Sequence, residues 1–304
     1  MPIMIHAIVK QNKLRVYVSM ALLTFLLGLL GTFLSAIFHW GLSGTGVFLI
    51  IAGIINFIAF YFSDRFLLRV SGCRRLQREQ VPQLFSMVEE LSQASELPMP
   101  ALYLIEEDAM NAFATGRDPA HAAVAVTRGL LEKLSPDEIK AVMAHELSHI
   151  QQHDMRLMAV VSILAGLISI LADIYWRGQL ASKLEERDRS GVLAWVGLLL
   201  SVFAPLSAMF IQLAISRRRE FLADAAGADM IHDPSGLISA LKKIHMDRRP
   251  LARTNPATAH IYFANPYKAA GFIDKMFSTH PPLEERVLQL ESLERGQSVG
   301  RTSA

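Results

Sequence analysis

The chain has 304 residues and a formal net charge of +2, with hydrophobic residues at 52% of its positions and charged residues at 19%. This apolar share is above that of ordinary globular chains and the charged share is below it. The pair of deviations excludes intrinsic disorder and favours a membrane protein over an all-soluble enzyme. The even charge balance gives no indication of a nucleic-acid partner. Cys73 is the only cysteine, which excludes an internal disulfide and a zinc site built from several thiolates.

The first hydrophobic region contains no Asp, Glu, Lys or Arg from Val16 to Ser63. Lipid offers the backbone no hydrogen-bond partner, so a chain crosses it as a helix of about 20 apolar residues. The region is long enough for two crossings, and the glycines and serines between His39 and Gly44 predict the turn between them. Residues 14–63 are therefore expected to form a pair of transmembrane helices.

A second pair of hydrophobic helices is expected within residues 155–216. The stretch from Val192 to Ser216 is uncharged, whereas the stretch from Leu157 to Trp176 contains Asp173 near one end and is either a span or a buried, partly inserted helix. Lysines and arginines cluster before the first span and after the second and fourth, which places both termini in the cytoplasm under the positive-inside rule. Basic residues between the third and fourth spans reduce this charge asymmetry and so weaken the orientation drawn from it.

The remaining segments, 64–154 and 217–304, have the mixed composition of a folded cytoplasmic domain in two parts. Apolar residues at helical spacing predict a helix from Pro82 to Glu96. Short apolar runs predict strands at Leu102–Ile105 and Ala122–Thr127, with a third candidate strand at Asn111–Gly116.

A capped helix is expected to begin at Ser135-Pro136-Asp137-Glu138, because Ser followed three residues later by Glu forms a capping box. It should extend from Pro136 to about His153.

This helix carries His145-Glu146-Leu147-Ser148-His149. Residues four apart share a helical face, so both imidazoles can reach one ion, and neutral imidazole is a favoured ligand of Zn²⁺. Glu146 stands beside the first histidine, where its carboxylate can accept a proton from a water molecule that attacks a peptide carbonyl. The alternative is an amphipathic helix with two surface histidines.

A catalytic zinc needs a third protein ligand. Met155 and Gln152 occupy the positions where one class of zinc protease has histidine and glycine, which excludes that class. Glu220 is the better candidate, and Asp224, one turn later, could hold the free ring nitrogen of a ligand histidine. Small residues after Glu220 favour a closely packed helix over a solvated one.

These motifs, in this order, resemble the HtpX-type membrane metalloproteases, a family related to the CAAX prenyl proteases. The resemblance covers nearly the whole chain, including the Asn111–Gly116 segment, Arg-Arg-Glu-Phe-x-Ala-Asp and Ser278-Thr279-His280-Pro281-Pro282. It implies one Zn²⁺ per chain with Glu220 as third ligand and Asp224 behind the ligands. It also implies a protein quality-control and stress-response role: cleavage of misfolded or damaged membrane proteins at the cytoplasmic face of a bacterial inner membrane.

The expected fold is an α-helical membrane protein with about four transmembrane helices. Its cytoplasmic, mainly helical α+β domain should be zincin-like and carry a small sheet. The resemblance places a strand at the edge of the cleft, where it could pair with substrate through main-chain hydrogen bonds; the alternative is a plain hairpin strand. The residues of this strand are Asn111, Ala112, Phe113 and Ala114. His280 and Arg286 are candidate donors to the oxyanion of the tetrahedral intermediate, unless His280 only ends a loop before a helix.

Two other functions are open to the sequence. A membrane scaffold or chaperone with a purely structural zinc would need a closed site of four ligands, and the sequence offers three. A transporter is disfavoured, because Asp173 is the one charged residue in the predicted spans. The sequence does not determine the substrates or the oligomeric state.

Overall fold

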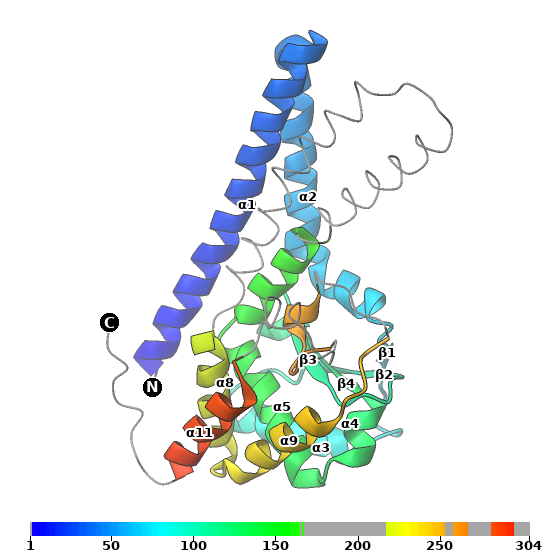
Figure 1. The fold of residues 1–304 in the computed structure, drawn as a ribbon, viewed down its shortest axis with the longest axis vertical. Helices are drawn as coiled ribbons and strands as arrows, with labels where there is room; N and C mark the ends of the chain where they lie inside the picture. The colour runs from blue at the N-terminus through cyan, green and yellow to red at the C-terminus, as the bar shows by residue number, and fades with distance from the viewer. Residues whose placement is uncertain (1, 165, 167–216, 253–257, 267–280, 295–304) are drawn as a thin grey trace.

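The structure is a computed structural model that describes residues 2–164, 166, 217–252, 258–266 and 281–294. A long helical hairpin projects from a rounded domain, as Figure 1 shows. The hairpin consists of α1 (Pro2–Phe38) and α2 (Gly41–Val70). Its turn lies where the sequence predicted it, and His39 and Gly41 have positive φ angles of 56° and 62° there.

Both hairpin helices are long and apolar enough to cross a membrane, over Ala7–Leu29 and Gly41–Val70. Their outward surfaces are apolar: Phe25, Ile50 and Phe57 are 63%, 65% and 57% exposed. The other two predicted spans fall mainly outside the described residues. Residues 154–164 are helical, and several of their apolar side chains pack against α1 and α2.

Small and polar residues hold α1 and α2 together. A Cβ atom at Gly31 would lie 2.6 Å from the Cβ of Phe48, so only glycine allows this approach. The side chain of Asn56 donates from Nδ2 to the carbonyl of Met20 at 3.1 Å and to Thr24 Oγ1 at 2.8 Å. Hydrogen bonds of this kind join helices in an apolar medium.

The rounded domain contains one described sheet of four strands in the order β1-β2-β4-β3. β2 and β4 are parallel, while β1 and β3 pair antiparallel with β2 and β4 respectively. The three predicted strands are confirmed; the two-residue β1 has no periodicity to read from the sequence. The strands are β1 (Arg74–Arg75), β2 (Ala101–Ile105), β3 (Ala112–Gly116) and β4 (Ala122–Thr127).

α5 (Pro136–Gln151) lies at the centre of this domain and packs against α3, α8, α9 and β3. Eleven of its sixteen residues are buried, which makes it the best protected element for a reactive site. The other described helices are α3 (Pro82–Ala94), α4 (Arg128–Lys133), α8 (Arg217–Ile231), α9 (Ser235–Met246), α11 (Leu283–Glu294) and the 3-10 turns η1 (Pro119–His121) and η2 (Ala259–Ile261).

Both ends of α5 are fixed. The predicted capping box is present, with Glu138 Oε2 accepting from the Ser135 amide at 2.7 Å. Glu138 also accepts from Ser239 and Lys243 of α9, at 2.6 and 2.8 Å. At the other end His153 takes a positive φ of 57°, so the chain turns before the next helical segment begins at residue 154.

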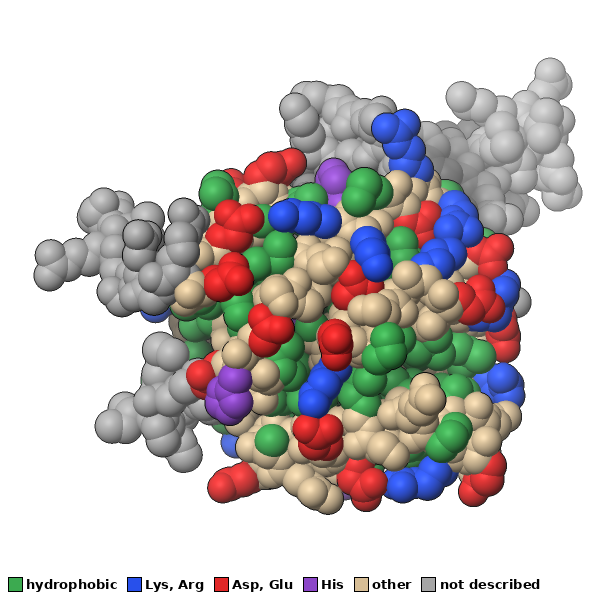
Figure 2. Space-filling model, turned by 90° about the horizontal axis from the view of Figure 1, so that it is seen from below, with side chains coloured by type: hydrophobic (Ala, Val, Ile, Leu, Met, Phe, Trp, Pro, Cys, Tyr) green, Lys and Arg blue, Asp and Glu red, His purple; other side chains and the backbone are tan. Residues whose placement is uncertain are grey.

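The face of the domain farthest from the hairpin is polar and of mixed charge. Figure 2 shows acidic and basic side chains interspersed across it, with hydrophobic side chains between them. This surface is typical of protein in contact with water and contrasts with the apolar outside of the hairpin.

Candidate metal centre

The site forms where α5 and α8 touch. A Cβ atom at Gly227 would lie 2.9 Å from the backbone nitrogen of His145, so glycine brings the two helix backbones together at the motif itself. Ala223 is buried in α8, and its carbonyl accepts a hydrogen bond from Ser148 Oγ of α5 at 3.3 Å. The prediction that the small residues after Glu220 pack closely against another helix is confirmed.

Three potential metal ligands converge at this contact. One nitrogen each of His145 and His149 and one carboxylate oxygen of Glu220 all lie within 4.8 Å of one another, and all three side chains are buried. The two Nε2 atoms are 3.1 Å apart. The Glu220 oxygens lie 4.0 Å from His145 Nε2 and 3.9 Å from His149 Nε2. These three residues could hold a metal ion.

A carboxylate stands behind each imidazole. Asp224 Oδ1 lies 2.9 Å from Nδ1 of His145. Asp154 Oδ2 lies 3.0 Å from Nδ1 of His149. A carboxylate at Nδ1 favours the proton on that nitrogen and leaves the Nε2 lone pair directed at the common point.

This donor set fits a zinc ion. Two imidazole lone pairs facing each other at 3.1 Å repel unless a proton or a metal cation lies between them. Two nitrogens and one carboxylate oxygen are ligands that Zn²⁺ accepts, and three protein ligands leave one tetrahedral position open. The described residues provide no fourth carboxylate, imidazole or thiolate in this group, in contrast to a closed structural site.

The two imidazoles differ in their affinity for protons. Complete burial lowers the pKa of His145 to about 4, despite the opposing effect of Asp224. Burial also disfavours the charged form of His149, but the charge of Asp154 outweighs it and raises the pKa of His149 to about 9. A cation in this position therefore competes with one proton shared by the pair.

Glu146 lies beside the ligands and is 2% exposed. Burial raises its pKa to about 7, although the charge of His149 and a hydrogen bond from the Ala114 amide act in the opposite direction. A carboxylate whose pKa is near neutrality can both accept and return a proton. β3 thus contacts the predicted general base through its backbone.

The predicted substrate-binding strand is β3, an edge strand, but the chain itself covers part of that edge. The amide of Phe263 donates to the carbonyl of Ala112 at 2.8 Å. The carboxamide of Asn111 donates to the carbonyl of Ala264 at 2.9 Å and accepts from its amide at 3.1 Å. Asn111 is therefore engaged within the chain, and the role of Asn111 to Ala114 in substrate binding stays a prediction.

Of the two predicted oxyanion donors, the structure describes Arg286 alone. His280 lies outside the described residues. Arg286 is 3% exposed and donates from Nε and Nη2 to the two oxygens of Asp224, at 2.7 and 2.6 Å. Its guanidinium carbon also lies 4.9 Å from the ring centre of Phe263. These contacts make Arg286 a positioning residue for Asp224, and its oxyanion role stays a prediction.

Two charged residues of the site, Asp154 and Arg219, were not predicted from the sequence. Asp154 reaches back to His149 because the helix is interrupted at His153, and no helical spacing rule links positions five apart across a break. Arg219 lies 3.4 Å from Asp154 through its Nε. The sequence showed only that Asp154 is a charged residue shortly after the His-Glu-x-x-His motif and that Arg219 precedes the predicted ligand Glu220.

Comparison with known proteins agrees with this geometry. The model of "Peptidase family M48" matches residues 78–294, which include the whole site. The chain belongs to peptidase family M48. It is 41% identical to a "Protease HtpX homolog" of Thermoanaerobacter pseudethanolicus, over 93% of this chain and 96% of that protein. It is 38% identical to a "Protease HtpX homolog" of Tropheryma whipplei, over 95% of this chain and 99% of that protein.

Among solved structures, the chain is similar to the crystal structure of S. mikatae Ste24p, with a TM-score of 0.50 and 21% identity. The match covers 80% of this chain and 57% of Ste24p, so it supports the fold and nothing further. Family membership makes the chain a metallopeptidase, which favours the enzyme over the scaffold and the transporter. The resemblance to HtpX-type proteases drawn from the sequence is confirmed.

Proposed function

We propose that this M48 metallopeptidase is a zinc-dependent endopeptidase of a bacterial inner membrane. Its role is to cleave misfolded or damaged membrane proteins at the cytoplasmic face. The observation that carries the chemistry is the convergence of three ligand side chains with one further buried carboxylate, Glu146, beside them.

Each residue of the site has a separate role in this proposal. His145, His149 and Glu220 would hold the ion, and Asp224 and Asp154 would keep the two imidazoles oriented. A bound zinc ion would supply Lewis-acid chemistry, which lowers the pKa of water to about 7. Glu146 accepts the proton of the attacking water and returns it to the leaving amine. The buried position of Glu146 keeps bulk water from competing for that proton.

The membrane location is supported by the hairpin. α1 and α2 expose apolar side chains along their length, and exposed apolar surface of that extent has no stable place in water. The domain continues directly from the end of α2, so the metal centre is tethered close to the base of the hairpin. A protease tethered in this way meets segments that protrude from the bilayer.

The test compares detergent-purified wild type with Glu146→Gln and with Glu132→Gln, an exposed glutamate of the same domain. Glu146→Gln should keep its zinc and lose cleavage of an unfolded protein substrate by about 10²–10⁴-fold, because the amide cannot accept the proton. Glu132→Gln should behave as wild type. Cleavage by zinc-loaded Glu146→Gln at the wild-type rate would falsify the general-base assignment.

A further inference from the structure

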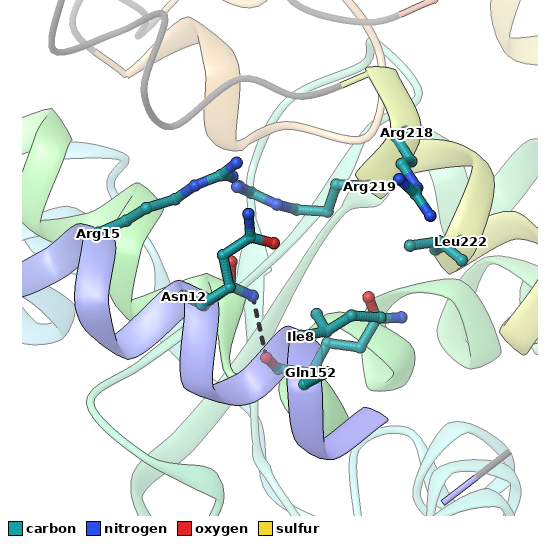
Figure 3. Close-up of a pocket in the computed structure, with 9 residues that line it drawn as sticks. Ile8, Asn12, Arg15, Gln152, Arg218, Arg219 and Leu222 are labelled. Atoms are coloured by element: carbon teal, nitrogen blue, oxygen red, sulfur yellow. Dashed lines mark hydrogen bonds between the residues drawn. The ribbon is translucent and has the colours of Figure 1, made fainter. Parts of the chain in front are cut away.

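A cavity outside the metal centre separates the first turns of α1 from the start of α8 (Figure 3). Its volume is about 450 Å³, within the usual range for sites that bind small molecules. The polar residues that line it are all cationic or neutral. They are Arg15, Arg218, Arg219, Gln11, Asn12 and Gln152.

The arginines of the cavity favour an anion. Figure 3 shows the side chains of Arg15 and Arg219 pointing toward each other from α1 and α8, and their two charges repel. Asp154 lies 3.4 Å from Arg219 and offsets one of the three positive charges. No carboxylate belongs to the described residues that line the cavity. Two guanidinium groups that converge in this way are the usual receptor for a phosphate group.

An amide group of the cavity also lacks a partner. Gln152 is 3% exposed, and its Oε1 accepts no hydrogen bond within the described part of the chain. Its backbone carbonyl accepts from Asn12 Nδ2 at 3.1 Å, which fixes this residue against α1 (Figure 3). A buried acceptor without a donor is costly. A phosphate group that carries a hydroxylated headgroup would bring both the negative charge and the missing donor.

The cavity lies where the apolar outer surface of the hairpin begins. Leu14, next to Arg15, and Tyr17 and Val18, just after it, are 61%, 56% and 48% exposed. A ligand with a phosphate at one end and hydrocarbon chains at the other matches this change of surface. A free phosphate ion would use the arginines but not the apolar surface.

We propose that this cavity binds the headgroup of an anionic phospholipid, with the phosphate between Arg15 and the two arginines of α8 and a headgroup hydroxyl directed at Gln152. The cavity is separate from the metal centre, and two successive side-chain contacts connect them. Arg219 contacts Asp154, and Asp154 contacts His149. Lipid binding would therefore steady an arginine that helps to orient a metal ligand.

The experiment measures thermal unfolding of the purified full chain in a neutral detergent, with added phosphatidylglycerol, phosphatidylcholine or inorganic phosphate. The double variant Arg15→Gln/Arg218→Gln removes two charges from the cavity without altering Arg219. The control Lys13→Gln/Arg217→Gln removes two charges from exposed positions of the same helices outside the cavity. Native mass spectrometry of wild type counts retained lipids independently of any variant.

Phosphatidylglycerol should raise the Tm of wild type by about 2–4 °C and be retained at least about tenfold more than phosphatidylcholine. The cavity variant should lose most of that shift, and the charge-matched control should keep it. Equal loss in both variants, or equal retention of the two lipids by wild type, would overturn the proposal in favour of general surface charge. If inorganic phosphate raised the Tm as much as phosphatidylglycerol does, the cavity would bind free phosphate and the lipid proposal would be refuted.

Lipid binding at this cavity rests on the membrane location in the proposed function, but it does not require that the chain cleave peptides. The same measurements can be made on Glu146→Gln, which keeps the cavity intact. Lipid retention by that variant without any proteolysis would separate this site from the proposed function. Wild type that cleaves substrate but retains no anionic lipid would leave the proposed function standing and refute this site.

Discussion

Among the described residues, the helix pairs α1/α2 and α5/α8 both pack closely, but they bury different kinds of side chain. Each pair approaches through a glycine, Gly31 in the hairpin and Gly227 in the metal centre. The hairpin buries neutral polar groups such as Ser19 and Asn56 and exposes its apolar side chains. The α5/α8 pair buries ionisable groups inside an apolar core.

The difference follows from what surrounds each pair. An apolar exterior leaves the hairpin helices to be held by close packing and by neutral hydrogen bonds. In the domain, buried charges are tolerated because each one has an oppositely charged or ligating neighbour. Asp224, for example, contacts both His145 and Arg286. The metal centre is therefore a network in which removal of one member affects the others, whereas hairpin contacts are separable.

The largest effect should follow from Glu220→Ala. This variant removes a ligand from α8 and leaves two imidazoles, so zinc affinity should fall by more than the roughly 10–100-fold typical of the loss of an outer partner. Metal content after dialysis against a competing chelator measures the change. Asp229→Ala, an exposed position on the same helix, is the control. Full zinc occupancy in Glu220→Ala would move the third ligand elsewhere.

Asp154→Asn should have the next largest effect. The amide no longer attracts the Nδ1 proton of His149 as strongly and also loses its charge contact with Arg219. Zinc affinity should fall by roughly 10–100-fold while the three ligands remain. Competition with a chromophoric chelator measures the affinity, and Asp137→Asn, exposed at the start of α5, should leave it unchanged. An unaltered affinity in Asp154→Asn would mean that the buried charges are not coupled to the metal.

The two glycines test the comparison directly. Gly227→Ala and Gly31→Ala each place a methyl group in space that is already occupied, so each should lower the free energy of unfolding by about 1–3 kcal/mol. Zinc affinity should fall in Gly227→Ala alone. Gly53→Ala is the control, because a Cβ atom there meets no atom within 4 Å. Loss of zinc in Gly31→Ala would show that hairpin and metal centre form a single cooperative unit.

The smallest effect concerns the capped start of α5. Burial acts to raise the pKa of Glu138, but hydrogen bonds from Lys243, Ser239 and the Ser135 amide outweigh it and hold that pKa below its usual value. A lowered pKa contributes stability above the unfolded-state pKa of about 4.3, and this contribution is lost as the pH falls through the folded-state value.

Glu138→Gln should therefore lower the free energy of unfolding by about 1 kcal/mol at neutral pH. The gap between variant and wild type should narrow in acid. Thermal unfolding followed by circular dichroism between pH 7 and acid conditions measures the gap, with the exposed Glu132→Gln as control. A gap that widens on acidification would contradict the assigned direction.

Local signals in the sequence were enough for the hairpin, the capped helix and three strands of the sheet. These features depend on spacing along a single element: apolar length, capping residues and short apolar runs. The His-Glu-x-x-His pair and its place on one helical face belong to the same class. The run of small residues around Gly227 predicted close helix packing, but the sequence did not show that Gly227 packs against His145 of α5.

The sequence by itself determined which side chains could bind a metal, because residue type fixes the ligand chemistry and spacing along a helix fixes which residues share a face. Only the tertiary structure decided that Asp154 turns back to His149, that Arg286 binds Asp224, and that residues 263–264 cover the edge of β3. Those contacts join elements far apart in the chain or cross a helix break. Their geometry is set by how helices and strands pack, and no local pattern encodes it.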